Sequence, residues 1–298
     1  MTDSTATLIE RVRSIMPDLK IEHIECVREG VINDVAIVNQ ELVFRFAKSE
    51  EYASLLEVEA GILNFIRPHL TIDVPKPIYI GTGCMVYPLL RGQQFTLKAV
   101  QAFDEQTQRY LARQLGSFLF QMHSLNITNL DAQLPVTRAY VTREEWIRVQ
   151  EEVKSKVFPL LEDYQIEWAE DLFMGVLENP ETFKYVPAFI HGDLASCHIL
   201  YDVGKEKITG IIDFSMAGIG DPASDIGHLI NIYGETFVQK MHQAYPDLDI
   251  LLPRARFYAQ AMELEWILRG LETGATFWFT GHLASARDIR TSSLKSFY

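Results

Sequence analysis

The hydrophobic period of the chain changes near Gly92, and this change limits the possible folds more than any other feature. Before it, short β-branched and aromatic runs are broken by Gly and Asn turn residues, which is typical of hairpins. The predicted strands are residues 21–27, 34–38, 41–46, 76–80 and 85–89. Apolar spacing predicts helices over residues 6–16 and 51–66, the second ended by Pro68. After Gly92 long helices are predicted near residues 100–124, 142–176, 222–244 and 252–273.

Two lobes follow from this change of period. Residues 1–91 are expected to form a small lobe with an antiparallel sheet, and residues 92–298 a larger helical lobe. Nothing rich in Pro or Ser separates them, so a tight hinge beside a cleft is expected. The fold class is therefore α+β.

Charge and cysteine content exclude several classes of protein. The 298 residues include 40 acids and 27 bases, a formal net charge of −13. A chain this acidic is a poor nucleic-acid binder and attracts cationic partners instead. Its three cysteines (Cys26, Cys84, Cys197) form no CxxC pair, which argues against a disulfide framework. With no apolar run long enough for a membrane helix and no secretion signal at the start, a cytoplasmic protein without a membrane partner is expected.

The segment from Phe189 to Asp225 carries the residues best suited to chemistry, FIHGDLASCHILYDVGKEKITGIIDFSMAGIGDPASD. Residues 189–212 predict a hairpin-like unit that presents Asp193, His198 and Asp213 at one rim. One carboxylate to accept a proton, and a His with a second carboxylate to hold a hard cation, suit phosphoryl transfer. Residue by residue, other interpretations stay open: Asp193 as a helix cap or turn residue, and His198 as a structural histidine.

This segment resembles the catalytic core of the aminoglycoside and macrolide phosphotransferases, which are protein-kinase-like small-molecule kinases. The resemblance rests on His191, Asp193, the Asp213-Phe214 pair and the run Asp221-Pro222-Ala223-Ser224-Asp225. It implies a bilobal protein-kinase-like fold, Asp193 as the catalytic residue, and Mg²⁺ held by His198 and Asp213. ATP or GTP would be the phosphate donor. His198 stands where the family usually has Asn. The resemblance is closer to the 2″-aminoglycoside and macrolide kinases, which also have His at this position.

The N-terminal part resembles the family's nucleotide site. Arg45 and Glu59 match its strand lysine and helix glutamate, with Lys48 as the alternative to Arg45 and a plain salt bridge as the alternative role. Gly30 matches the turn that covers the nucleotide. Backbone groups of Tyr87 and Leu89 are expected to contact the purine.

Acidic residues point to a cationic acceptor. Residues 157–183 contain seven acids and no Lys or Arg. Glu235, Glu263 and Glu265 lie in later predicted helices near the aromatic residues Trp266, Trp278 and Phe279. Such a pocket would bind the ammonium groups of an aminoglycoside, and Glu235, Glu263 and Trp266 are the predicted acceptor-binding residues.

Three alternatives remain at this point, one for the role of the acidic residues and two for the function. The acids of residues 157–183 could simply face solvent. The acceptor could be a macrolide or another small alcohol, such as a choline-like or sugar hydroxyl. The protein could also bind nucleotide without catalysis.

Overall fold

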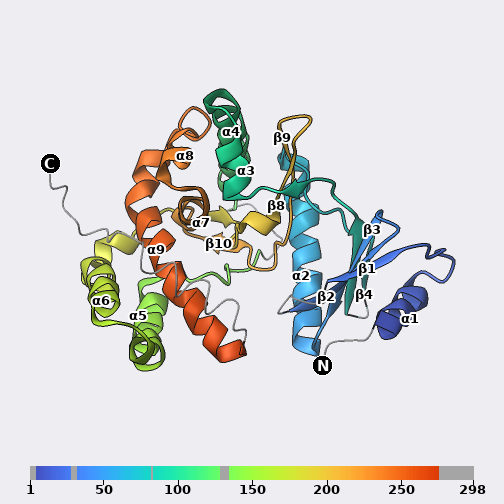
Figure 1. Ribbon diagram of the computed structural model, residues 1–298, viewed down its shortest axis with the longest axis horizontal. Helices are drawn as coiled ribbons and strands as arrows, with labels where there is room; N and C mark the ends of the chain where they lie inside the picture. The colour runs from blue at the N-terminus through green and yellow to red at the C-terminus, as the bar shows by residue number, and fades with distance from the viewer. Residues whose placement is uncertain (1–4, 28–31, 82, 128–133, 275–298) are drawn as a thin grey trace.

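A five-stranded antiparallel sheet forms the first part of the molecule, in the order β1–β2–β3–β5–β4 (Figure 1). The computed structural model describes residues 5–27, 32–81, 83–127 and 134–274. The strands are β1 (Ile24–Val27), β2 (Asn33–Val38), β3 (Leu42–Ala47), β4 (Tyr79–Gly81) and β5 (Cys84–Pro88). All five predicted strands are therefore present, with shifted ends.

The two-residue period of β3 sends its side chains to opposite faces of this sheet. Phe44 and Phe46 pack with Leu8 and Val12 of helix α1 (Thr5–Ile15), which covers one face. Val43 belongs to the core on the other face, which helix α2 (Glu50–Ile66) covers. Arg45 alternates with the two phenylalanines and therefore lies on the α2 side.

Helix α2 begins where its sequence provides a cap. The Ser49 hydroxyl accepts a hydrogen bond from the Tyr52 backbone N–H at 3.2 Å. Its last turn passes into a short 3₁₀ turn (Arg67–His69) that contains Pro68. The predicted helix over residues 51–66 is confirmed.

Small sheets follow in the second part, and they correct the predicted hairpin-like unit. Strand β8 (Ile199–Asp202) pairs with β9 (Lys207–Ile211) as a hairpin, and β6 (Gln93–Gln94) adds to its other edge. Strand β7 (Ala188–Ile190) instead pairs with β10 (Gly218–Gly220). The strands within residues 189–212 therefore belong to two different sheets and do not form a single hairpin.

Helices dominate the second part, and three of the four predicted ones are broken into shorter helices, whereas the last, α9, begins earlier than predicted. The helices are α3 (Leu97–Ala102), α4 (Glu105–His123), α5 (Arg143–Glu152), α6 (Asp163–Leu177), α7 (Ala223–Tyr233), α8 (Glu235–Gln239) and α9 (Leu248–Thr273). Asp104 caps α4 and so separates it from α3. Pro159 lies in the irregular turns between α5 and α6, and Gly234, at φ 81°, separates α7 from α8.

One large hydrophobic core joins the two parts. It contains Val43 and Met85 of the sheet as well as Phe214 and Ile226 of the second part. The sheet ends at Pro88 and β6 begins at Gln93, so the predicted boundary between residues 91 and 92 falls in this connection. That division into lobes stays a prediction.

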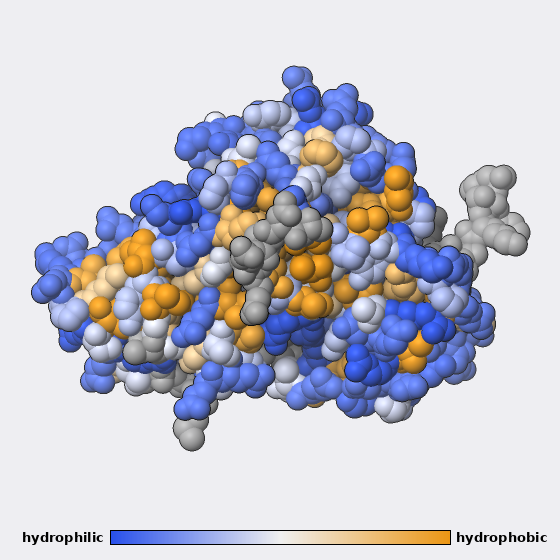
Figure 2. Space-filling view, turned by 180° about the vertical axis from the view of Figure 1, so that it is seen from behind, coloured by the Kyte–Doolittle hydropathy of each residue, from blue (hydrophilic) through white to orange (hydrophobic). Residues whose placement is uncertain are grey.

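The surface seen from behind is mostly hydrophilic, with apolar side chains gathered in a band across its middle (Figure 2). Among the described residues, no helix has both the length and the apolar character needed to cross a bilayer.

Candidate active site

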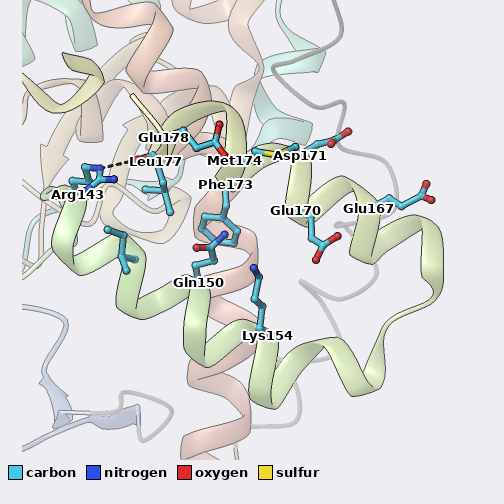
Figure 3. Close-up of a pocket in the computed structure, with 11 residues that line it drawn as sticks. Arg143, Gln150, Lys154, Glu167, Glu170, Asp171, Phe173, Met174, Leu177 and Glu178 are labelled. Carbon is cyan, nitrogen blue, oxygen red and sulfur yellow. Dashed lines mark hydrogen bonds between the residues drawn. The ribbon is translucent and has the colours of Figure 1, made fainter. Parts of the chain in front are cut away.

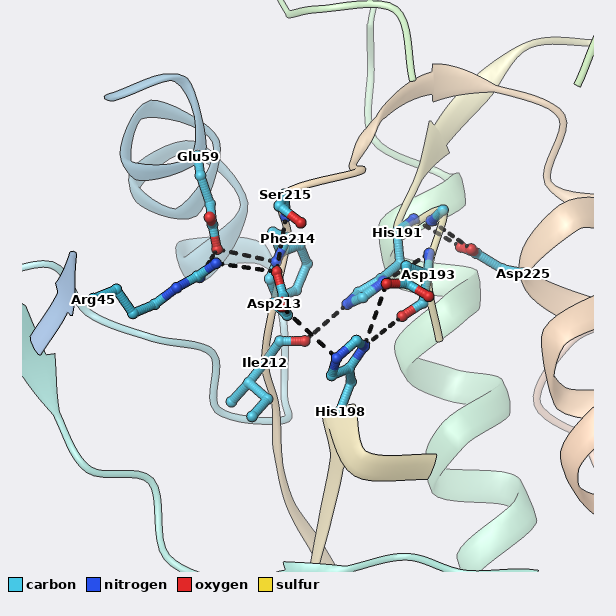
Figure 4. Close-up of polar contacts among 11 residues, drawn as sticks. Arg45, Glu59, His191, Asp193, His198, Ile212, Asp213, Phe214, Ser215 and Asp225 are labelled. Atoms are coloured by element: carbon cyan, nitrogen blue, oxygen red, sulfur yellow. Dashed lines mark hydrogen bonds and ion pairs between the residues drawn. The ribbon is translucent and has the colours of Figure 1, made fainter. Parts of the chain in front are cut away.

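The loop after β7 is held in one conformation by His191. Its Nε2 lies 3.1 Å from the Ile212 carbonyl oxygen, and its Nδ1 lies 3.2 Å from the Asp193 backbone nitrogen (Figure 4). A carbonyl can only accept, so Nε2 carries the proton and Nδ1 accepts from Asp193. Burial lowers the pKa of His191, which keeps the ring neutral. His191 therefore braces the loop, and its two ring nitrogens are both occupied in doing so.

Asp225 of α7 anchors the same loop from behind. Its carboxylate accepts hydrogen bonds from the backbone N–H groups of His191 and Gly192, each at 2.8 Å, and lies 3.0 Å from His123 Nε2. Burial alone would raise its pKa, but these partners lower it. Gly192 has φ 77°, and a Cβ there would lie 2.9 Å from the Met216 carbonyl oxygen. Only glycine fits this position without rearrangement.

Asp193 and His198 meet on the open side of the loop. The His198 Nδ1 donates to the Asp193 carbonyl oxygen at 2.8 Å, and it lies 3.8 Å from the carboxylate Oδ2 of Asp193. The Nε2 of His198 lies 3.7 Å from Oδ2 of Asp213. Burial opposes a charge on His198, but a hydrogen bond with Cys197 and the carboxylates of Asp193 and Asp213 raise its pKa to about 10. The imidazole thus holds a proton between two carboxylates.

Asp213 joins this loop to the sheet. Its Oδ1 lies 3.2 Å from Arg45 Nη2, and its backbone has φ 63°, a conformation that Asp tolerates better than most residues. Burial opposes ionisation, but Arg45 and His198 lower the pKa of Asp213 well below its usual range. The carboxylate is therefore charged and points between the sheet and the loop.

Arg45 and Glu59, which match the family's strand lysine and helix glutamate, form a buried ion pair. The Arg45 Nη1 lies 2.6 Å from Glu59 Oε1, and the two side chains are 6% and 1% exposed. The same Oε1 accepts from the Phe214 backbone N–H at 3.1 Å. Lys48 lies 3.6 Å from Asp34 and beyond the end of β3, so Arg45 is the cation beside Asp213.

Asp213 and His198 could together bind a hard cation that keeps water or phosphate oxygens as its other ligands. Because Nδ1 of His198 donates to a carbonyl, Nε2 is the nitrogen that would bind a cation on the Asp213 side, and it would give up its proton to do so. Nowhere in the described part of the chain do three or more His, Cys, Asp or Glu side chains form a metal-binding group. Mg²⁺ usually takes one or two carboxylates and completes its shell with water and phosphate oxygens. Asp213 fits that pattern well, while His198 offers a softer nitrogen.

The predicted purine contacts lie along β5. The Leu89 N–H donates to the Glu41 carbonyl oxygen at 2.7 Å, so this donor already has a partner within the sheet. Tyr87 is buried on the α2 side, where burial raises its pKa to about 12 although Arg45 opposes that shift. Gly30 lies outside the described residues.

The predicted acceptor residues do not all face the loop. Glu235 pairs with Arg256 at 2.6 Å on α8, among exposed groups. Glu263 is buried against Asn231 of α7. Trp266 is partly buried on α9. Trp278 and Phe279 lie outside the described residues.

The acids of α6 line a separate groove of about 710 Å³ between α5 and α6 (Figure 3). Glu167, Glu170 and Asp171 share this groove with Lys154 and Arg143, and none of the loop residues lines it. These acids are therefore not part of the site around Asp193.

Sequence reasoning named Glu265 but missed its ion pair with Arg269 on α9. Arg269 Nε and Nη2 lie 2.9 and 2.8 Å from Oε1 of Glu265, and the guanidinium lies 5.9 Å from the ring of Tyr140, whose neighbour Ala139 packs against Gly192 of the loop. Burial raises the pKa of Glu265, although Arg269 opposes the shift. The signal in the sequence was the spacing of four residues between an acid and an arginine.

Comparison with known proteins identifies the family. The model of the phosphotransferase enzyme family matches residues 23–258. The viomycin phosphotransferase of Streptomyces vinaceus is 30% identical over 224 residues, which cover 72% of this chain and 75% of that protein.

Solved structures agree with this match. The GDP complex of aminoglycoside 2'-phosphotransferase-IIIa superposes with a TM-score of 0.85 at 27% identity, covering 96% of this chain and 98% of the other. Macrolide 2'-phosphotransferase type I, at 19% identity, shares the fold with a TM-score of 0.75, covering 96% and 98% of the two chains. The chain therefore belongs to the phosphotransferase enzyme family, and its fold is the bilobal kinase-like one.

Proposed function

We propose that this phosphotransferase transfers the γ-phosphoryl group of a nucleoside triphosphate to a hydroxyl of a cationic small molecule of the aminoglycoside type. One observation carries the proposal. Asp193, His198 and Asp213 converge from two loops, and Arg45 of the sheet reaches the same point from the other side. The antibiotic-kinase character of the relatives supports the same reaction class.

Asp193 is the proposed catalytic residue. Its carboxylate accepts the proton of the acceptor hydroxyl as the oxygen attacks the γ-phosphorus. The new bond joins the acceptor oxygen to phosphorus, and the bond to the β-phosphate oxygen breaks, so that a nucleoside diphosphate leaves. His191 and Asp225 take no part in the transfer, because their polar atoms are occupied in fixing the loop.

Arg45 and Asp213 form the donor side of the proposed site. Arg45, held by Glu59, can turn its second nitrogen from Asp213 to a phosphate oxygen. Asp213 and His198 would hold Mg²⁺, which when bound neutralises charge on the β- and γ-phosphates. The purine would lie against β5, where the Leu89 N–H is already bonded and carbonyl groups remain as its partners.

A cationic acceptor is favoured by the negative charge of the chain and by the acidic side of α9. Glu265 is paired with Arg269, whose guanidinium lies 5.7 Å from the ring of Trp266. Viomycin is a specific second candidate, because a viomycin kinase is 30% identical to this chain. Erythromycin and choline test the remaining acceptor classes.

Release of nucleoside diphosphate tests the proposal directly. The enzyme is assayed with Mg²⁺ and ATP or GTP, in turn with kanamycin, gentamicin, viomycin, erythromycin, choline and no acceptor. We expect acceptor-dependent release that Asp193→Asn lowers about 10²- to 10⁴-fold. Asp202→Asn, the same change in a carboxylate paired with Lys205 on β8, serves as the matched control and should leave the rate unchanged. Turnover by Asp193→Asn within a few-fold of the parent would exclude Asp193 as the base.

A further inference from the structure

Glu265 and Arg269 form an ion pair on α9 beside two aromatic rings. Both nitrogen contacts of Arg269 converge on one carboxylate oxygen of Glu265, at 2.9 and 2.8 Å. The guanidinium carbon also lies 5.9 Å from the ring centroid of Tyr140 and 5.7 Å from that of Trp266. A carboxylate with two aromatic rings around a cation is the arrangement that proteins use to bind ligand ammonium groups.

This arrangement differs from an ordinary surface ion pair in two respects. The Glu265 side chain is only 15% exposed, whereas Arg269 is 39% exposed and so can move into solvent. The pair also lies near the catalytic loop: Arg269 contacts the ring of Tyr140, and the preceding residue, Ala139, lies 3.4 Å from the position of a Cβ on Gly192, next to Asp193. An exposed pair with the same spacing, Glu105 and Arg109 on α4, has both side chains more than half exposed and touches none of the site residues.

His228 of α7 is a further neighbour of Glu265, and its charge opposes the rise in the pKa of that carboxyl. Its Nδ1 lies 2.9 Å from the Ser224 carbonyl oxygen. Glu263 does not join the subsite, because its carboxylate contacts Asn231.

We propose that Arg269 is a built-in competitor for the acceptor: it occupies the Glu265 subsite, and an ammonium group of a cationic acceptor binds by displacing it. The inference rests on the proposed function, since it names how the acceptor side of that site selects charge. With Arg269 in place the subsite is neutral overall, so an uncharged acceptor gains nothing there. A cationic one gains the carboxylate and the two rings once Arg269 has moved to solvent.

Calorimetric titration of kanamycin into the full-length protein, without triphosphate, tests this inference. Competition predicts that Arg269→Ala binds kanamycin more tightly than the parent, by roughly five- to thirtyfold if about 1–2 kcal/mol of competition is removed. Arg269→Lys retains the competing charge and should bind like the parent. Glu265→Gln should bind more weakly by a similar factor. Arg256→Ala, which removes an arginine from a carboxylate pair elsewhere on α9, is the matched control and should change nothing.

The direction of the change separates competition from a structural role. If Arg269 only stabilises α9, its removal weakens binding or leaves it unchanged, and either result overturns the inference. Absence of kanamycin binding in every variant overturns it as well.

Failure of the proposed function can be distinguished from failure of this inference. If the affinities change as expected but no phosphate is transferred, the subsite stands and the proposed reaction is wrong. If kanamycin is phosphorylated while Arg269→Ala binds no more tightly, only the subsite is wrong.

Discussion

Asp225 is a buried carboxylate and Glu265 a mostly buried one, but their surroundings differ in kind. Asp225 lies behind the loop and receives two backbone N–H groups and a histidine. Glu265 lies on α9 and has the partly exposed guanidinium of Arg269 as its main partner. A carboxylate bonded to fixed backbone donors holds the fold, whereas one bonded to an exchangeable side chain is suited to a ligand.

The pKa shifts of the two carboxylates have opposite signs because their hydrogen-bond partners differ. The donors around Asp225 more than offset burial and lower its pKa, while burial prevails at Glu265 and raises it. In the folded protein the charge of Asp225 is therefore stabilising, and that of Glu265 is costly.

The largest effect is expected from Asp225→Asn. An amide offers one acceptor in place of two, so either the His191 or the Gly192 N–H loses its partner inside the protein. The free energy of unfolding should fall by about 1–3 kcal/mol, measured by urea denaturation, and activity should fall with it as the loop loosens. A loss below about 0.5 kcal/mol would mean that Asp225 does not anchor the loop.

The pH dependence of stability distinguishes the two carboxylates next. The lowered pKa of Asp225 gives stability that is present above its unfolded value of about 3.9 and is lost as the pH falls through the folded pKa. The deficit of Asp225→Asn should therefore be constant from about pH 5 to 7. The raised pKa of Glu265 gives stability that is present below about 4.3 and is lost as the pH rises through the folded pKa. Glu265→Gln should consequently gain on the parent as the pH rises above about 4.3, as measured by urea unfolding at a series of pH values.

The smallest effect is the stability change of Glu265→Gln at neutral pH. Removing a buried charge should raise the free energy of unfolding by up to about 1 kcal/mol, because Arg269, at 39% exposure, can be hydrated without its partner. Thermal unfolding provides the measurement, with Glu235→Gln, which removes the charge from the more exposed pair with Arg256, as the control. A loss of more than about 1 kcal/mol would make Glu265 structural, like Asp225.

Much of the catalytic side could be predicted from sequence because its geometry is local. Asp193 and His198 lie five residues apart on one loop, and Asp213 follows the next strand. Arg45 and Glu59 were named only through the family resemblance, and the structure pairs their side chains.

The acceptor side could not be predicted in the same way. Helix α9 is 26 residues long with buried residues all around it, so the apolar pattern does not show which face points to the loop. Two positions along a helix turn the side chain by about 200°, which is why Glu263 contacts Asn231 while Glu265 pairs with Arg269 on another side of the helix. Pro159 interrupts the predicted helix 142–176, although the apolar spacing continues through it.

The shared oxygen of Glu59 has a consequence for motion between the two halves of the molecule. Oε1 accepts from Arg45 on the sheet and from the Phe214 N–H, next to Asp213. A displacement of α2 therefore moves the arginine and the Asp213 backbone in the same direction. A substitution on α2 that shifts Glu59 should therefore disturb Arg45 and the Asp213 backbone together, although neither lies on that helix.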